Sequence, residues 1–156
     1  MIGVFRQDRA RRIGAFPISI DFDRFAADAR KPTVVELMHR IRENPANRTL
    51  LLGVDRLDYT KGIPYRLLAF RDALFRYPQL RRKVTLVQVV VPSRTGISKY
   101  RELRAEIERL VGGINGRFAR ADWVPVHYAF RLLTPEELLA FYRAADVALI
   151  TTLKDG

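Results

Sequence analysis

The sequence predicts an α/β fold in which a parallel sheet carries helices on both faces. Strand-like and helix-like apolar patterns alternate along the chain, which is the order that a parallel sheet with helical crossovers requires. The run 84–91 is rich in β-branched residues, which is typical of a strand covered on both faces. A second apolar run, 49–54, leads through a short basic loop into a helix that starts at Pro64.

The first predicted elements are a strand, a helix and a second strand. A short strand is expected at 15–20, near a sheet edge because Pro17 has no backbone N–H to donate. Apolar residues recur at helical spacing over 33–41, which predicts a helix. The run 49–54 follows as a buried strand.

The middle of the chain predicts a helix, a strand and another helix. The helix over 64–77 has an apolar stripe and is ended by Pro78. The strand over 84–91 follows. The next helix spans 98–111 and is expected to end at Gly112-Gly113, because paired glycines are typical of turns.

The last part of the chain predicts two more strands around one helix. Asn115-Gly116 marks a turn, and a strand is expected over 123–128. A helix over 135–145 turns several apolar side chains, Tyr142 among them, toward the core. The final strand is expected over 146–152.

Size and composition predict one domain over residues 1–156, with a real hydrophobic core. The chain has 48% hydrophobic residues and no cysteine, so disulfides and Cys-ligated metals are excluded and a reducing compartment fits. No apolar run is long enough for a membrane helix, and the basic start of the chain lacks the apolar core of a signal peptide. We therefore expect a cytoplasmic protein without a membrane partner, and homo-oligomer formation is left open.

The chain is strongly basic, with 28 Lys and Arg against 17 Asp and Glu and a net charge of +11. This charge fits nucleic acid, phosphorylated small substrates, or a fragment whose acidic partner domain is elsewhere. The basic residues are not interleaved with aromatic residues in the way that base-stacking proteins use. Nucleic-acid binding is therefore not the favoured function.

The most informative loop follows the strand 49–54 and contains Arg56 and Lys61. In open parallel sheets ligands bind beyond the carboxyl ends of the strands. The N-terminus of the helix at Pro64 offers unpaired N–H groups, and the two cations add a fork and a point charge for phosphate oxygens. This arrangement suits a diphosphate, although any basic α/β protein can carry two cations in such a loop.

The other strand ends point to the same edge of the sheet. Arg94 follows the strand 84–91 and precedes a helix, and Asp155-Gly156 follows the last strand. His39 and His127 are expected on a helix surface and within a strand, not as catalytic groups. No metal-ligand spacing, P-loop or G-x-G-x-x-G pattern is present in the sequence.

The loop sequence VDRLDYTKGI, residues 54–63, resembles the signature of the trehalose-6-phosphate synthase family of nucleotide-sugar glycosyltransferases. The closing ADVALITTLKDG, residues 145–156, resembles the family independently. The resemblance implies that Arg56 and Lys61 bind the diphosphate of UDP-glucose and act catalytically by stabilising it as it leaves.

The same resemblance assigns four further residues. Arg94, in Pro92-Ser93-Arg94, matches the family Arg that binds the phosphate of the acceptor, glucose 6-phosphate. Leu133 matches a position that touches the nucleotide base through its backbone, although Phe130-Arg131-Leu132 departs from the usual H-R-S. Asp155 and Gly156 match the start of the segment that binds the donor glucose.

The resemblance covers nearly the whole chain and implies a partial C-terminal half of a GT-B glycosyltransferase, a Rossmann-like nucleotide-sugar-binding domain. The family reaction transfers glucose from UDP-glucose to glucose 6-phosphate with retention, giving trehalose 6-phosphate and UDP. No metal and no other cofactor is implied. The N-terminal half, which holds most of the acceptor site, is the expected missing partner, so we expect this chain alone to be inactive.

Two alternatives remain open from the sequence. One is a related synthase with another acceptor, such as a glucosylglycerol-phosphate synthase or a pseudo-sugar coupling enzyme. The other is a non-catalytic module that binds UDP-sugars or nucleic acid.

Overall fold

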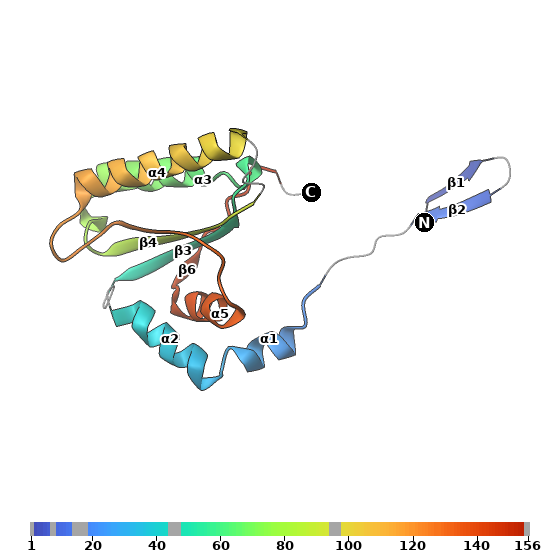
Figure 1. Cartoon of the computed structure of the whole chain (residues 1–156), viewed down its shortest axis with the longest axis horizontal. Coiled ribbons are helices and arrows are strands. Elements are labelled where there is room, and N and C mark those ends of the chain that lie inside the picture. The colour runs from blue at the N-terminus through green and yellow to red at the C-terminus, as the bar shows by residue number, and fades with distance from the viewer. Residues whose placement is uncertain (1, 7–8, 14–18, 44–47, 94–97, 155–156) are drawn as a thin grey trace.

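A four-stranded parallel sheet forms the centre of the molecule (Figure 1). The computed structural model of the chain describes residues 2–6, 9–13, 19–43, 48–93 and 98–154. The strands stand in the order β5-β4-β3-β6. Their bounds are Thr49–Arg56 for β3, Val84–Val91 for β4, Val126–Phe130 for β5 and Val147–Ala148 for β6.

The order of the strands reverses direction at β3. β3 pairs with β4 along its whole length, from Thr49 opposite Val84 to Arg56 opposite Val91. The chain proceeds outward from β3 to β4 and then β5, and returns to the other side of β3 to form β6. Such a reversal is a topological switch point, and ligands bind in the crevice at the carboxyl ends of the two strands that flank it.

Helices cover both faces of this sheet (Figure 1). α3 (Ile63–Arg76) and α4 (Ser98–Phe118) lie on one face. α2 (Pro32–Glu43) and α5 (Pro135–Ala144) lie on the other, and the short α1 (Phe22–Asp28) precedes α2. The predicted α/β class with helices on both faces is therefore confirmed.

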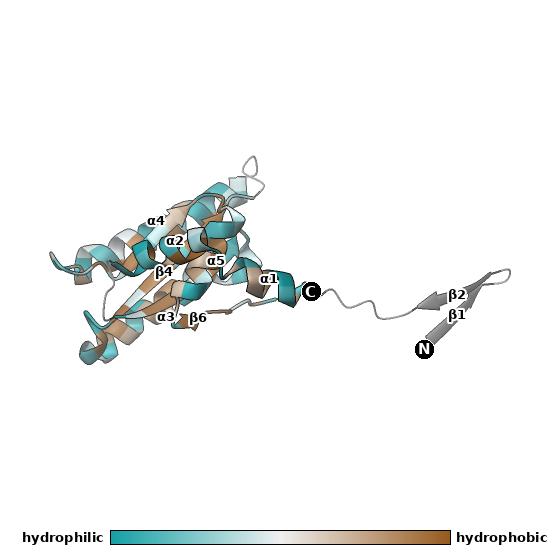
Figure 2. Ribbon diagram, turned by 90° about the horizontal axis from the view of Figure 1, so that it is seen from below, coloured by the Kyte–Doolittle hydropathy of each residue, from teal (hydrophilic) through white to brown (hydrophobic). Residues whose placement is uncertain are grey.

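Alternate side chains of the strands build a core on each face of the sheet. The ribbon of β4 is mostly apolar in colour (Figure 2). Leu86 and Val90 face α3 and α4, and Leu50 and Leu52 face the α2 and α5 side. All four side chains are buried, with exposures of 0% or 1%. Each such aliphatic side chain contributes about 1.5–3 kcal/mol on burial, so the sheet is fixed by packing from both sides.

The prediction that α4 ends at Gly112-Gly113 is wrong, and so is the turn at Asn115-Gly116, because the helix continues to Phe118. Ile114 and Phe118 are 1% and 5% exposed, so stopping the helix would uncover two apolar side chains. The Asn115 amide also donates to the carbonyl of Val126 (2.8 Å) and accepts from its N–H (3.0 Å). These contacts outweigh the roughly 1 kcal/mol that a helical glycine costs.

Other boundaries also differ from the sequence expectation. The expected strand 146–152 is reduced to β6, because only Leu51 and Leu52 of β3 are its ladder partners. The expected strand 123–128 begins later, at Val126, because Trp123 pairs with Arg120 in a turn. The expected strand 15–20 falls largely outside the described residues, and Ser19 and Ile20 are not in a strand.

Two local elements were not predicted. Strands β1 (Ile2–Arg6) and β2 (Arg9–Ile13) pair antiparallel and do not join the four-stranded sheet. α1 starts where the Asp21 carboxylate accepts a hydrogen bond from the N–H of Arg24, which is a helix N-cap. Within the described part of the chain, no helix has the length and apolarity needed to cross a membrane.

Candidate functional site

A pocket of about 270 Å³ lies at the switch point, at the carboxyl ends of β3 and β6. Its walls come from β3, the turn after it, α5, and the segment that follows β6. The lining residues are Leu52, Val54, Asp55, Arg56, Lys61, Tyr142, Ala148, Leu149, Ile150 and Thr152. The predicted pair Arg56 and Lys61 is therefore brought together in one pocket.

The end of β3 and the turn after it fix the backbone positions of the two cations. Leu57 is buried, and its N–H donates to the carbonyl of Val91 (2.8 Å), which anchors the turn to β4. Asp58 accepts from the N–H of Thr60 (2.9 Å) and from its hydroxyl (2.8 Å), and so caps the 3₁₀ turn Tyr59–Lys61. Within the described residues, the exposed guanidinium of Arg56 has no hydrogen-bond or ion-pair partner.

Gly62 joins this turn to α3. Its backbone is left-handed, with φ 65° and ψ 24°, a conformation that L side chains rarely adopt. α3 then begins at Ile63 with Pro64 in its first turn, as the sequence predicts within one residue. The N-terminus of a 14-residue helix therefore lies directly after Lys61, and it adds partial positive charge at this edge of the sheet.

The segment after β6 forms the second wall of the pocket. The N–H of Leu149 donates to the carbonyl of Leu52 (2.7 Å), and the N–H of Leu153 donates to the carbonyl of Thr60 (2.8 Å). The segment is thus attached to β3 at one end and to the 3₁₀ turn at the other. Tyr142, which the sequence placed toward the core, is 46% exposed and lines this pocket, because it lies on the outer side of α5.

A buried polar network lies behind the pocket and was not predicted. The side chain of Arg66, in α3, is only 2% exposed. Its Nη1 donates to Oδ2 of Asp55 and to Oε1 of Gln88 (2.9 Å), and its Nε donates to the hydroxyl of Thr151 (2.9 Å). The sequence did carry a signal for it, because Gln88 interrupts an apolar strand and Arg66 lies beside the apolar stripe of its helix.

Among the other predicted site residues, Leu133 lies within the described part of the chain and is not among the residues that line this pocket. Leu133 is half-buried and packs against the core cluster that contains Leu50 and Leu52. Arg94, Asp155 and Gly156 lie outside the described residues, so their predicted roles stay predictions.

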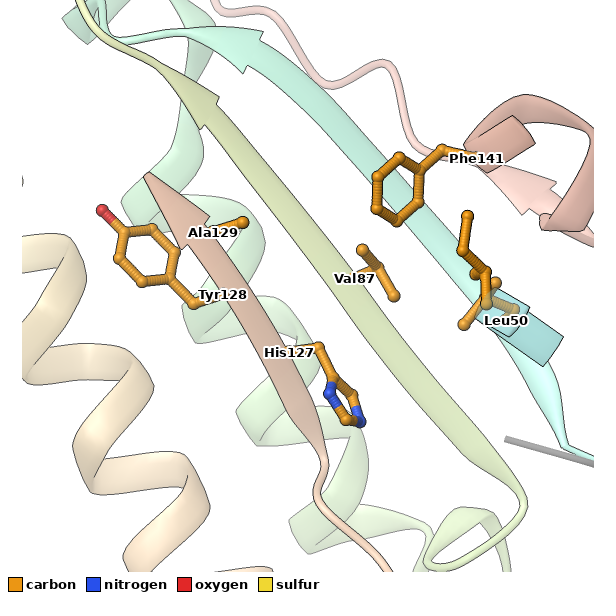
Figure 3. Close-up of a pocket in the computed structure, with 7 residues that line it drawn as sticks. Leu50, Val87, His127, Tyr128, Ala129 and Phe141 are labelled. Atoms are coloured by element: carbon orange, nitrogen blue, oxygen red, sulfur yellow. The ribbon is translucent and has the colours of Figure 1, made fainter. Parts of the chain in front are cut away.

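A second, largely apolar pocket of about 220 Å³ lies on the α2 and α5 side of the sheet (Figure 3). Leu50, Val87 and His127 line it from three neighbouring strands, and Phe141 lines it from α5. Burial, with the nearby charge of Arg48, lowers the pKa of His127 below its ordinary value. The walls contain no Lys or Arg among the residues described, so this pocket does not suit a phosphate.

The switch-point pocket can stabilise an anion by fixed charge. Arg56 and Lys61 supply two positive charges, and the carboxylate of Asp55 is neutralised by Arg66. Preorganised cations of this kind stabilise charge that develops on a leaving group. Within the part of the chain that the structure describes, no group of His, Cys, Asp or Glu is arranged to hold a metal ion.

Comparison with known proteins identifies a matching family and curated relatives. The profile of Glycosyltransferase family 20 matches residues 3–156. The chain is 46% identical over 148 residues to a bifunctional trehalose-6-phosphate synthase/phosphatase of Thermoproteus tenax, covering 95% of this chain and 20% of that protein. It is 41% identical over 154 residues to the 56 kDa subunit of the UDP-forming alpha,alpha-trehalose-phosphate synthase of Saccharomyces cerevisiae, covering 99% and 31%.

Solved structures share the same fold over this region. A UDP-forming alpha,alpha-trehalose-phosphate synthase from Burkholderia xenovorans, in complex with glucose-6-phosphate, matches with a TM-score of 0.92 at 33% identity, over 99% of this chain and 34% of that one. An E. coli structure bound with UDP-2-fluoro glucose matches with a TM-score of 0.89 at 30% identity, over 99% and 36%. The chain thus spans about a fifth to a third of the length of these relatives.

Proposed function

The chain belongs to glycosyltransferase family 20, and from this membership we propose that it supplies the donor-diphosphate side of a glucosyl transfer. The donor is UDP-glucose, the acceptor is glucose 6-phosphate, and the products are trehalose 6-phosphate and UDP. The proposal draws on the relatives, which are UDP-forming trehalose-phosphate synthases. We propose the transfer reaction only for the whole protein. The related enzymes are about three to five times as long as this chain.

One observation carries the proposal, which is that Arg56 and Lys61 line the same switch-point pocket. A nucleotide diphosphate placed there would lie beside both cations and beside the N-terminus of α3. As the bond between the glucose and the diphosphate breaks, negative charge grows on the leaving phosphate. Two cations whose backbone positions are set by the end of β3 and by the capped turn would stabilise that charge, and this lowers the barrier.

The remaining site residues enter the proposal through the family. Arg94 would hold the phosphate of the acceptor sugar and so orient the attacking hydroxyl. Leu133 would contact the nucleotide base through its backbone, and Asp155 and Gly156 would face the donor glucose. A different acceptor, such as glycerol phosphate, would use the same donor pocket, so the donor assignment does not depend on the identity of the acceptor. A cytoplasmic location, without a metal requirement, completes the proposal.

Calorimetric titration of the chain with UDP and UDP-glucose tests the donor assignment directly. We expect saturable binding that weakens about tenfold to a hundredfold in Arg56→Ala and in Lys61→Ala, since a hydrogen bond to a charged group contributes about 1.5–3 kcal/mol. Both side chains lie at the surface of the pocket, so neither substitution is expected to unfold the chain.

Matched controls replace the same residue types elsewhere. Lys83→Ala removes an exposed lysine just before β4, at the opposite edge of the sheet, and Arg109→Ala removes an exposed arginine of α4. Both controls should bind UDP like the unsubstituted chain. Equal losses in the controls and in the pocket variants would contradict a specific donor site.

A further inference from the structure

We propose that Arg66 is a positioning residue of the donor pocket, which holds the segment after β6 against the end of β3 and cancels the charge of Asp55. This inference rests on the proposed function for the identity of the ligand. Arg66 does not line the pocket. It acts through Asp55, which does line it, and through Thr151, the neighbour of the lining residues Ile150 and Thr152.

The contacts of Arg66 span both sides of the switch point. Nη1 binds the Asp55 carboxylate at the end of β3, and Nε binds the Thr151 hydroxyl after β6 (2.9 Å). A single rigid guanidinium thus joins the two walls of the pocket. Its planar fork allows both contacts at once, which a lysine ammonium at the end of a flexible stem cannot reproduce with the same geometry.

The carboxylate of Asp55 explains why the pocket needs the positive charge of Arg66 behind it. The Asp55 side chain is 10% exposed and borders a pocket that we assign to a diphosphate. An uncompensated carboxylate there would repel the ligand. Arg66 pairs with Asp55 from the buried side, and Gln88 Nε2 lies 3.3 Å from the same carboxylate oxygen. Arg66 therefore offsets the carboxylate that borders the same pocket as Arg56 and Lys61.

Gly53 shows how closely this network is packed. A Cβ at residue 53 would lie 2.3 Å from Nη1 of Arg66 and 2.5 Å from Oε1 of Gln88. Both side chains are buried and hydrogen-bonded to each other, so neither can move aside at low cost. The absence of a side chain at Gly53 therefore leaves the room that the Arg66 guanidinium occupies.

Three variants test the proposal by two measurements. Arg66→Met removes the charge and both contacts, Arg66→Lys keeps only the charge, and Thr151→Val removes only the contact to the segment after β6. Arg71→Lys is the matched control, because Arg71 lies on the same helix and its guanidinium pairs with its neighbour Asp72. Thermal melts followed by circular dichroism identify a temperature at which all of the variants are folded, and both measurements are made at that temperature.

The first measurement is amide hydrogen exchange without ligand. The N–H of Leu153, which donates to Thr60, should exchange at least tenfold faster in Thr151→Val and in Arg66→Lys, while the amides of the β3–β4 ladder keep their protection. Arg71→Lys should leave Leu153 unchanged. If the Leu153 N–H kept its protection in both Thr151→Val and Arg66→Lys, the proposal would be overturned, whether or not the chain binds UDP.

The second measurement is calorimetric titration with UDP. Affinity should fall in the order unsubstituted chain, Arg66→Lys, Arg66→Met, with at least a tenfold loss in Arg66→Met and none in Arg71→Lys. A folded Arg66→Met chain that binds UDP normally would overturn the positioning role. An unsubstituted chain that does not bind UDP would instead contradict the proposed function, and the exchange of Leu153 would still decide whether Arg66 holds the two walls together.

Discussion

At the scale of single residues, Gly62 is constrained both by its own backbone conformation and by a neighbouring segment. Its φ of 65° is unfavourable for any residue with a Cβ, and a Cβ there would lie 2.8 Å from the carbonyl oxygen of Thr151. The first constraint comes from the turn before α3, and the second from the segment after β6. One glycine therefore allows both walls of the pocket to meet.

We predict that Gly62→Ala destabilises the chain by about 2–4 kcal/mol, because it combines left-handed strain with a contact to backbone that cannot move easily. Urea denaturation followed by circular dichroism measures the change. Gly113→Ala is the control, since a Cβ there meets nothing within 4 Å in the middle of α4. That substitution should raise stability by about 0.5–1 kcal/mol. An equal response of the two glycines would refute this account of Gly62.

The shared location of Arg56 and Lys61 could be predicted from the sequence, whereas the partners of Arg66 could not. The first two follow a strongly apolar strand, and the rule that ligands bind at strand ends places them without knowledge of packing. Arg66 lies within a helix that reads as amphipathic, where an arginine is ordinarily a surface residue. Only the three-dimensional approach of β3, β4 and the segment after β6 gives it Asp55, Gln88 and Thr151 as partners.

At the scale of elements, helices were predicted best where a cap and an apolar stripe agree. α5 begins at Pro135 after Thr134, whose hydroxyl accepts from the N–H of Glu137 while the Glu137 carboxylate accepts from the N–H of Thr134. α4 was predicted too short, because the glycines at 112 and 113 indicate a turn when only the neighbouring sequence is considered. Its extension depends on Ile114 and Phe118 finding a core built by distant parts of the chain.

Asp146 shows how one carboxylate connects three elements. It accepts from Nη2 of Arg42 in α2 (2.6 Å) and from the N–H of Leu50 in β3 (2.7 Å), and it lies directly before β6. These two contacts, the Arg42 hydrogen bond first, hold the pKa of Asp146 below its ordinary value. The start of β6 is therefore tied to β3 by an ionised group.

The depressed pKa of Asp146 predicts a dependence of stability on acid. The Asp146 carboxyl binds a proton less readily in the folded chain than in the unfolded chain. Its contribution to the free energy of unfolding is therefore fully present above the unfolded pKa of about 3.9, and it is lost as the pH falls through the folded pKa. Asp146→Asn should therefore lower the unfolding free energy at pH 7, and should flatten its decline below about pH 5. Urea unfolding at a series of pH values measures both effects.

The control for this prediction is Asp23→Asn in the first turn of α1. Among the residues described, Asp23 has no side-chain hydrogen bond or ion pair. Its removal should leave the acid dependence nearly as it is. A pH profile that is the same for Asp146→Asn and for the unsubstituted chain would show that the contacts with Arg42 and Leu50 do not contribute to acid stability.

At the scale of the whole molecule, the net charge of +11 does not by itself indicate the ligand. Several arginines are engaged in local ion pairs, such as Arg104 with Glu108 and Arg131 with Glu137. What distinguishes the switch-point pocket is that its two cations are placed by the fold at one end of a parallel sheet. The total charge governs non-specific attraction, whereas the recognition of UDP that we propose depends on the placement of these two groups.

Salt dependence separates these two modes of binding. Binding to DNA through many phosphate contacts releases condensed counterions, and affinity falls about 10³- to 10⁵-fold between about 50 and 200 mM salt for 6–10 contacts. A diphosphate held by two positioned cations and a helix N-terminus releases far fewer ions. We therefore predict that the affinity for UDP falls less than about tenfold over the same range.

The comparison uses titrations of UDP and of a duplex of unrelated sequence at each salt concentration, with the Arg56→Ala variant alongside. Arg56→Ala should weaken UDP binding at every salt concentration while it leaves binding to the duplex nearly unchanged, because one charge among 28 contributes little to non-specific attraction. If UDP and the duplex shared the same steep salt dependence and the same response to Arg56→Ala, the pocket would be acting as part of a diffuse basic surface. We expect Arg56→Ala to affect UDP and not the duplex, because the fold places Arg56 beside Lys61 in the switch-point pocket, whereas duplex binding depends only on the total charge.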